Sequence, residues 1–328
     1  MALLRGRRDY VFDTQQVHLE EAIRGRTARR IRGHLRRMDS VAMITPRWSS
    51  PQGFLEDMAL DLAVDEPEIG CRTVSFRPLM GRSAPEAWNF LLRVLSELPG
   101  GDWGTRPVPM VCDRRGFFYA AEQLLESAHE QALYPVAMLA HGVEHLPVEI
   151  LDDLAQVWTR YLDQTRTGRR CTLMLAGSVD TPALDVGGAT RVELCDYGES
   201  EAAASLILKL GLVDPAVLDR AVRFSGGVPS LVEALGAGAL ERGELPRQPG
   251  ELLRCMGPTA EDLRGAVEMA LTSSGTADRF HMLLDGEART EDPDMDRSLL
   301  MAGLVRRVRV TGAPQVMLRS PALAAISS

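Results

Sequence analysis

The stretch Ser40-Val41-Ala42-Met43-Ile44-Thr45-Pro46-Arg47-Trp48-Ser49-Ser50-Pro51-Gln52 decides the fold. Its first five residues are apolar or small and predict a short buried strand over 40–44. A loop follows over residues 45–51, and the apolar pattern of residues 54–62 then predicts a helix. A strand that passes through a loop into a helix is the repeating unit of α/β proteins.

The same alternation continues along the chain. Further strands are predicted at residues 72–76, 134–140, 171–176 and 190–194. Helices are predicted between them, at residues 84–98, 117–133 and 150–162. The strand at 134–140 is apolar throughout, which is typical of a strand covered on both faces. We therefore expect a parallel sheet with helices on both sides.

The strand signal stops after residue 195, and helices are predicted at 199–210, 215–224 and 230–240. Residues 242–258 are rich in proline and glycine and are interpreted as a linker. Helices then follow at 260–273, 276–284 and 293–302, and a hairpin at 304–310 and 315–319, an order typical of a winged helix. The predicted division is 1–39, a helical segment; 40–195, the α/β core; 196–245, a helical lid; and 246–328, linker and winged helix.

The whole order of elements resembles the P-loop NTPases of the AAA+/STAND type. The resemblance runs from about residue 17 onward and includes Phe224-Ser225-Gly226-Gly227-Val228-Pro229-Ser230-Leu231, which is similar to the Ser-Gly-Gly-His-Pro segment of STAND lids. It implies an α/β fold: a P-loop NTPase-like parallel sheet flanked by helices, followed by an all-α lid and a winged-helix domain.

The residues that bind phosphate in such proteins are replaced here. Their loop has the form G-x-x-x-x-G-K-[ST], in which backbone N–H groups and the lysine bind phosphates and the hydroxyl binds Mg²⁺. Thr45 and Ser50 stand at the glycine positions, Pro51 at the lysine and Gln52 at the hydroxyl. Arg47 lies four residues before the lysine position, and the only lysine of the chain, Lys209, lies far away in sequence.

The carboxylates for Mg²⁺ and for water activation are replaced as well. Aligned on the STAND pattern, the strand before Leu146-Pro147 places His141 at the aspartate and Gly142 at the glutamate. The sequence therefore predicts a pseudo-ATPase with no catalytic residue, no metal and no cofactor. The vacated nucleotide-site positions are Thr45, Arg47, Ser50, Pro51, Gln52, His141 and Gly142.

One alternative for this region is a zinc site. His141-Gly142-Val143-Glu144-His145 matches H-x-x-E-H, in which two histidines one helical turn apart bind zinc and the glutamate acts as a base. The match follows a predicted strand and precedes Leu146-Pro147, so we expect it at a strand end and in a loop. That position disfavours zinc.

Charge is distributed unevenly. The 328 residues carry 37 Lys+Arg and 45 Asp+Glu, a net charge of −8, but residues 1–47 are +6 and the remainder is −14. Arginines are frequent in the predicted helix at 17–38 and at the tip of the predicted hairpin. They form either a solvated face or a contact for nucleic acid or an acidic partner. The candidate contacts are Arg26, Arg29, Arg30, Arg36, Arg37, Arg306, Arg307 and Arg309, with Arg319 also assigned to the tip.

Five cysteines without a C-x-x-C pair, and the lack of a signal peptide or membrane-spanning run, favour a cytoplasmic protein with free thiols. The resemblance implies a scaffold or adaptor that binds protein partners in bacterial signalling or defence, with an effector such as a peptidase among them. A DNA-binding AAA-like regulator is the alternative. A third possibility is nucleotide held without turnover through Arg47, the lid and base contacts.

Overall fold

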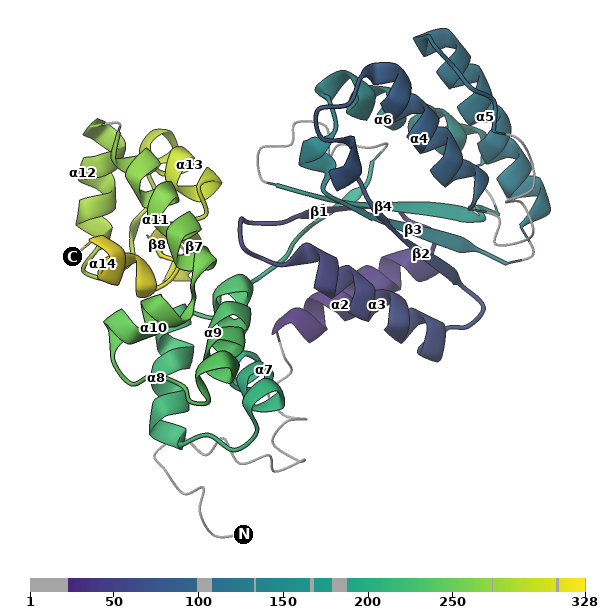
Figure 1. The fold of residues 1–328 in the computed structure, drawn as a ribbon. Helices are drawn as coiled ribbons and strands as arrows, with labels where there is room; N and C mark the ends of the chain where they lie inside the picture. The colour runs from purple at the N-terminus through teal and green to yellow at the C-terminus, as the bar shows by residue number, and fades with distance from the viewer. Residues whose placement is uncertain are drawn as a thin grey trace. The chain divides into compact units, whose positions relative to one another are not determined.

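The computed structural model describes residues 23–98, 108–132, 134–165, 168–178, 188–272, 274–310 and 313–327. The chain forms two compact units (Figure 1). The first, here called the α/β unit, comprises Thr27–Thr45 and Pro51–Leu194. The second, the helical unit, comprises Cys195–Ser328 together with Pro46–Ser50 and the residues up to Arg26. The loop Pro46–Ser50 thus belongs to the helical unit, although the residues on either side of it belong to the α/β unit.

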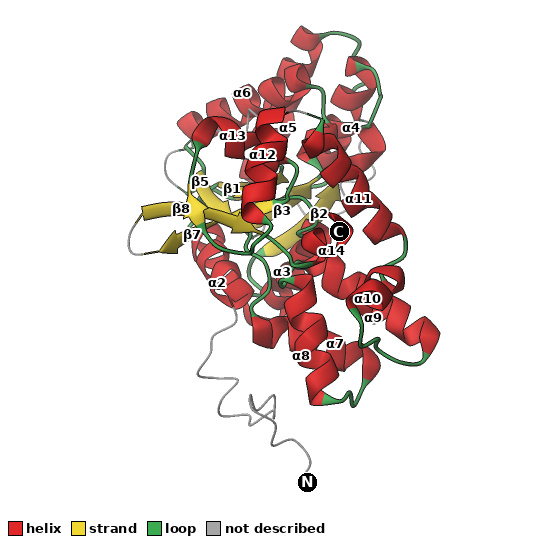
Figure 2. Ribbon diagram, turned by 90° about the vertical axis from the view of Figure 1, so that its left-hand side faces the viewer, coloured by secondary structure: helices red, strands yellow, loops and turns green. Residues whose placement is uncertain are grey.

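The α/β unit is built on a five-stranded sheet (Figure 2). All of its strand pairs are parallel, in the order β2-β3-β4-β1-β5. The predicted parallel sheet flanked by helices is therefore confirmed. The strands are β1 (Val41–Ile44), β2 (Gly70–Ser75), β3 (Val136–His141), β4 (Cys171–Gly177) and β5 (Thr190–Glu193).

Helices cover both faces of this sheet (Figure 1). One face carries α2 (Ile23–Arg36) and α3 (Pro51–Asp65), and the other carries α4 (Ala84–Ser96), α5 (Arg114–Gln131) and α6 (Val148–Gln164). Two short 3₁₀ helices, η1 (Arg77–Leu79) and η3 (Val143–His145), follow β2 and β3.

Alternating side chains of the strands serve the two faces. In β3, Met138 and Ala140 pack with α4 to α6, whereas Ala137 and Leu139 pack with α2 and α3. Successive side chains of a strand point to opposite faces, so a strand covered on both sides must be apolar at every position. This is why the continuous apolar run was diagnostic.

The helical unit combines helices with a small antiparallel sheet in the order β6-β8-β7. Its apolar core joins residues of α7 to α14 with residues of β7 and β8. Its elements are α7 (Glu199–Leu210), α8 (Pro215–Ser225), α9 (Pro229–Arg242), α10 (Pro249–Cys255), α11 (Pro258–Leu271), α12 (Ser274–Leu283), β6 (Arg289–Thr290), α13 (Pro293–Met301), β7 (Val305–Val310), β8 (Ala313–Leu318) and α14 (Ala322–Ser327).

Several boundaries differ from those expected. The segment interpreted as a linker contains α10, which begins at Pro249 and buries Leu252 in the core. Proline is well tolerated in the first turn of a helix, so this proline starts a helix instead of breaking one. The helix expected at 17–38 is described from Ile23 onward, and residues 17–22 lie outside the described part. No helix among the described residues is long and apolar enough to span a membrane.

Candidate functional site

The loop Pro46–Ser50 is tightly folded. Trp48 has φ 63° and Ser50 has φ 51°, both in the left-handed region that residues with a side chain seldom adopt. The amide and hydroxyl of Ser49 both donate to the carbonyl oxygen of Pro46, at 3.1 and 2.5 Å. Hydrogen bonds to the backbone carbonyl groups of Arg47, Trp48 and Ser49 stabilise this conformation.

These three carbonyl oxygens all accept hydrogen bonds from other residues of the helical unit. Trp48 O accepts from both the amide and the hydroxyl of Ser230, at 3.1 and 3.0 Å. Ser49 O accepts from Nη2 of Arg24. Arg47 O accepts from Nη1 of Arg319. The loop thus presents oxygen atoms to donors, two of them cationic, whereas a phosphate-binding loop presents N–H groups to an anion.

Arg319 is the centre of this arrangement. Its residue is 2% exposed, and its Nε and Nη2 lie 2.9 and 2.5 Å from the two carboxylate oxygens of Asp196. Its Nη2 also donates to the Ser49 hydroxyl at 3.1 Å. The assignment of Arg319 to an exposed hairpin tip is therefore wrong: the residue follows β8 and is buried. A cation with this many acceptors is fixed in one position.

Arg24 is the second buried cation, at 7% exposed. Its Nε donates to Cys195 O at 3.1 Å, and its guanidinium carbon lies 4.5 Å from the centre of the Tyr197 ring. Its own amide donates to Glu201 Oε1 at 3.0 Å. Burial lowers the pKa of Arg24, while the charges of Tyr197 and Asp196 oppose that shift. A guanidinium is so strongly basic that the group remains a cation.

Two glycines of the STAND-like segment allow the chain to pack closely around Arg319. Gly226 has φ +62°, and a side chain there would collide with the backbone of Arg319 and Ser320. Gly227 has φ +76°, and a side chain there would collide with the carbonyl group of Tyr197. In this chain, Gly226 and Gly227 therefore allow the backbone at Arg319 and at Tyr197 to approach closely.

The other vacated positions except Ser50 lie in the α/β unit. The amide and hydroxyl of Thr45 both donate to Gly177 O, at 2.8 and 2.9 Å, so this side chain is tied to the neighbouring strand. Pro51 is the first residue of α3 and provides no N–H. The exposed Gln52 donates to Glu56 Oε1 at 2.9 Å within the same helix. Ser50, in the loop, donates to Glu233 Oε2 at 3.3 Å.

His141 and Gly142 lie where β3 ends. His141 is in register with Ser75 of β2, and burial lowers its pKa. Gly142 has φ +76° and caps η3, and an added Cβ would lie 3.2 Å from Cδ2 of His145. The H-x-x-E-H residues thus span a strand end and a 3₁₀ turn, which lacks the helical geometry that zinc needs. Among the described residues, no cluster of three or more His, Cys, Asp or Glu could hold a metal.

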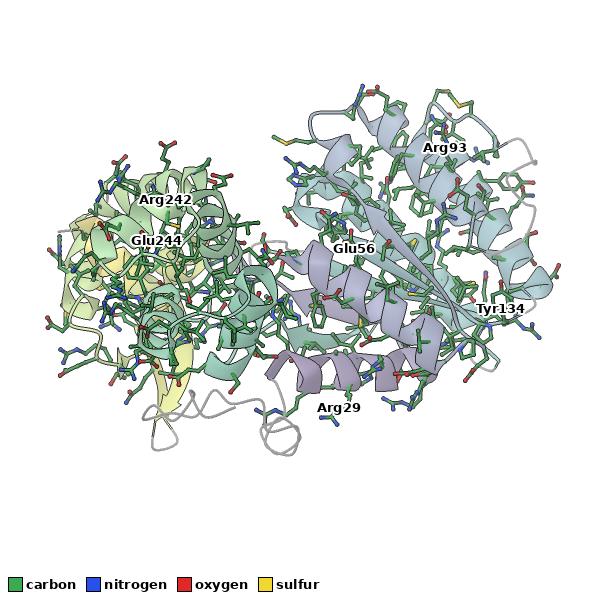
Figure 3. The ribbon with its side chains drawn as sticks, turned by 60° about the horizontal axis from the view of Figure 1, so that its bottom comes forward. Arg29, Glu56, Arg93, Tyr134, Arg242 and Glu244 are labelled. Atoms are coloured by element: carbon green, nitrogen blue, oxygen red, sulfur yellow. The ribbon has the colours of Figure 1, made fainter. Side chains whose placement is uncertain are left out.

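Several of the candidate basic contacts are used within the fold. Arg36 lies 2.5 Å from the buried carboxylate of Glu66, and Arg37 lies 3.0 Å from Asp39. Arg307 lies 2.8 Å from Glu291. Arg26, Arg29 and Arg30 of α2 are exposed, and Figure 3 shows Arg29 on the outer side of the helix.

The hairpin arginines differ from this group. Arg306 is half-buried, and its Nε has no hydrogen-bond partner among the described atoms. The side chain of Arg309 lies outside the described part.

Comparison with solved structures agrees with the topology. A Walker-type ATPase of Pyrococcus abyssi matches with a TM-score of 0.53 at 13% identity, over 92% of this chain and 95% of that chain. Cdc6p of Pyrobaculum aerophilum matches with a TM-score of 0.46 at 13% identity, over 93% and 92% of the two chains. A STAND protein with a tetratricopeptide repeat sensor, from Pyrococcus horikoshii, matches with 0.39 at 13% identity, over 91% of this chain and 41% of that chain.

No protein-family model and no curated protein matches the chain in sequence. The structural likeness to the Pyrococcus abyssi ATPase concerns the fold alone, because the identity is 13%. The chain has the fold of the P-loop ATPases, with guanidinium groups bound to the loop that follows its β1 strand.

Proposed function

We propose that this protein is a catalytically inactive scaffold or adaptor of the STAND/AAA type. In this proposal, α7 to α9 correspond to the lid, and the unit from α11 to α14 with β6 to β8 corresponds to the winged helix. The core has kept its sheet and lost its nucleotide chemistry. Its role is to bind other proteins, in a bacterial signalling or defence system if the family resemblance extends to function.

The reversed polarity of the loop 46–50 carries this proposal. Its carbonyl oxygens at Arg47, Trp48 and Ser49 face donors of the helical unit. These oxygens are already bound by donors of the same chain, and no lysine stands at the phosphate position to neutralise a triphosphate. Arg319 is paired with the carboxylate of Asp196, so it has less charge to offer to a phosphate.

The residues at the end of β3 argue against hydrolysis even if a nucleotide were bound. Mg²⁺ prefers carboxylate and water oxygens, and His141 offers an imidazole nitrogen, whose pKa burial lowers. Gly142 has no side chain that could orient or deprotonate water. Gln52, at the hydroxyl position, is engaged with Glu56.

A DNA-binding role has less support. Arg36, Arg37 and Arg307 are paired with carboxylates of the same chain, so they have less charge to offer to phosphates.

The experiment is a calorimetric titration of the purified protein with ATP and with ADP, each with and without Mg²⁺. We expect no binding heat under any of the four conditions, while an active P-loop ATPase in the same buffer binds. Saturable binding of either nucleotide would refute the scaffold proposal as stated and would favour a switch that holds nucleotide without turnover. Binding of protein partners should likewise be unchanged when nucleotide is removed with apyrase.

A further inference from the structure

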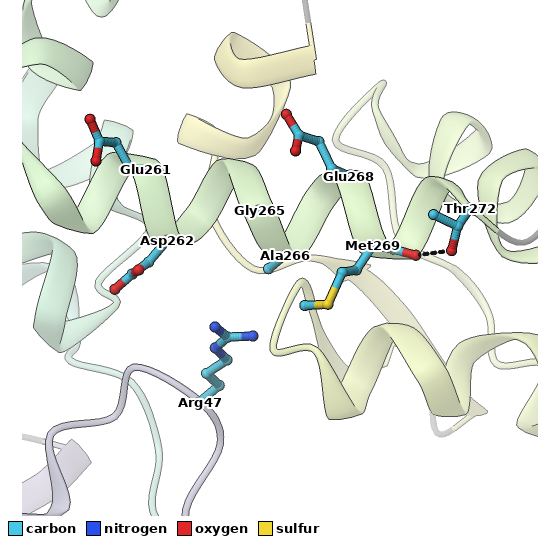
Figure 4. Close-up of a pocket in the computed structure, with 8 residues that line it drawn as sticks. All are labelled: Arg47, Glu261, Asp262, Gly265, Ala266, Glu268, Met269 and Thr272. Carbon is cyan, nitrogen blue, oxygen red and sulfur yellow. Dashed lines mark hydrogen bonds between the residues drawn. The ribbon is translucent and has the colours of Figure 1, made fainter.

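Helix α11 exposes a face that the rest of the helical unit does not cover. A groove of about 490 Å³ runs along this face and is bordered on one side by Arg47 (Figure 4). Three acidic side chains line it, and Met269 lies among them with 62% of its surface exposed. The residues of α11 and its end that line the groove are Glu261, Asp262, Gly265, Ala266, Glu268, Met269 and Thr272.

No contact with the described residues requires a glycine at position 265. It lies in the middle of α11, where glycine costs about 1 kcal/mol relative to alanine. A Cβ added there would meet nothing within 4 Å. By contrast, Cβ atoms added at Gly236 and Gly238 of α9 would collide with Lys209 and with the carbonyl group of Cys255. A glycine in open space on an exposed helix face is suited to close approach by another helix.

Helix α2 presents the opposite charge in a matching pattern. Arg30 is exposed, as is Arg37, which directly follows the helix. Arg37 also lies 3.0 Å from Asp39, so it would divide its charge between Asp39 and an acidic face that docks here. Between them lies Gly33, and a Cβ added there would have only Arg37 Nη1 nearby, at 3.9 Å. Ile31 and Leu35 point the other way, into the core, so the arginine-bearing face is directed outward.

The two faces are complementary when the helices run antiparallel. In α2 the order is Arg30, Gly33 and Arg37, with spacings of three and four residues. In α11, read backwards, it is Glu268, Gly265 and Glu261, with the same spacings. With glycine set against glycine, each arginine lies opposite a glutamate, and both charged pairs are separated by about 10 Å along the helix at 1.5 Å per residue.

We propose that two copies of this chain associate through α2 of one copy and α11 of the other. The glycines allow the two helices to approach closely, and the aliphatic parts of the arginine side chains cover Met269. The charged pairs favour the antiparallel orientation of the helices. Because each copy offers one α2 and one α11, two copies that exchange both contacts form a two-fold dimer, and copies that each make one contact per neighbour form a chain or a closed ring. The inference goes beyond the proposed function and does not depend on it, since neither face includes a vacated nucleotide position except Arg47 at the groove edge.

The test is sedimentation velocity over about 1 to 100 µM protein, a range in which weak to moderate self-association is populated. Wild-type protein should form species larger than a monomer, and its dissociation constant should rise about tenfold or more between about 50 and 500 mM NaCl, because salt screens the charges. The variants Glu261→Arg/Glu268→Arg and Arg30→Glu/Arg37→Glu should each be monomeric alone. An equimolar mixture of the two variants should associate again, because each supplies the face that the other has altered.

Two controls separate this contact from misfolding and from non-specific charge effects. Glu126→Arg/Glu130→Arg makes the same charge change on an exposed face of α5 and should associate like wild type. Gly265→Leu should prevent association while the circular dichroism spectrum and melting temperature are retained. A wild-type protein that is monomeric throughout would overturn the proposal, as would association that survives both charge reversals. Failure of the mixture to associate when each variant is folded would overturn it too.

Discussion

Replacing Arg319 by alanine should destabilise the protein by about 3 to 5 kcal/mol. Such a loss is typical when one partner of a buried ion pair is removed and the other is left buried without its counter-charge. The residue is 2% exposed, and the side chain of its partner Asp196 is 11% exposed. The substitution also leaves the carbonyl oxygen of Arg47 and the hydroxyl of Ser49 without the donor that the guanidinium provides. Both effects act in the same direction.

The assay is urea unfolding followed by circular dichroism, with the free energy obtained by linear extrapolation. Urea is used because guanidinium ions resemble the missing side chain. For the same reason, a low concentration of guanidinium chloride should raise the melting temperature of Arg319→Ala more than an equal concentration of NaCl does. Arg319→Lys should lose less stability than Arg319→Ala, because an ammonium keeps the charge without the two-pronged contact.

A double variant gives the sharpest check. Asp196→Ala/Arg319→Ala removes both charges, so it should lose less stability than the sum of the two single changes. The reasoning would be refuted by a loss of less than about 1 kcal/mol in Arg319→Ala, since a buried carboxylate stripped of its partner costs more than that. Strict additivity of the two single changes would refute the pairing of Arg319 with Asp196.

Three further predictions follow from single residues. Gly226→Ala should cost about 2 kcal/mol or more in urea unfolding, because φ is +62° and the added methyl would collide with the backbone of Arg319. Gly265→Ala should raise the free energy of unfolding by about 0.5 to 1 kcal/mol, because the methyl meets open space in a helix; a loss would contradict this. Burial lowers the pKa of His141 below its ordinary 6.5, so its unfolded state takes up a proton first as pH falls. Stability should therefore be full above pH 6.5 and decline toward the folded pKa, and His141→Gln should show a smaller decline over that window.

The elements that were predicted best are those whose local signals and packing agree. Helix α7 spans Glu199–Leu210 as expected, because its apolar face is continuous and Gly211 ends it with φ +74°. The strand at 136–141 was found because burial on both faces makes it apolar throughout. Helix α10 was missed because Pro249 and Gly257 resemble loop residues, whereas here they border a helix that tertiary packing stabilises.

The site was only half visible in the sequence. The replacements at Pro51, Gln52, His141 and Gly142 could be read by position alone. The buried positions of Arg24 and Arg319 could not be predicted. All but one of the 37 basic residues are arginine, and the sequence does not distinguish a buried arginine from an exposed one. The glycine pair at 226–227 was a usable signal, because it indicates close backbone packing, although it does not identify the residues that pack against it.

The two buried arginines also explain how the loop 46–50 keeps its shape in the proposed inactive core. Buried carbonyl groups must be hydrogen-bonded, and each one left unpaired costs about 1 to 3 kcal/mol. A loop turned away from phosphate directs carbonyl oxygens into the protein, and donors must be found for them. Arg319 reaches Arg47 O, Arg24 reaches Ser49 O, and Ser230 reaches Trp48 O. In the proposed inactive core, the shape of this loop therefore depends on these donors, because without Arg319, Arg24 and Ser230 the three carbonyl groups would be unpaired.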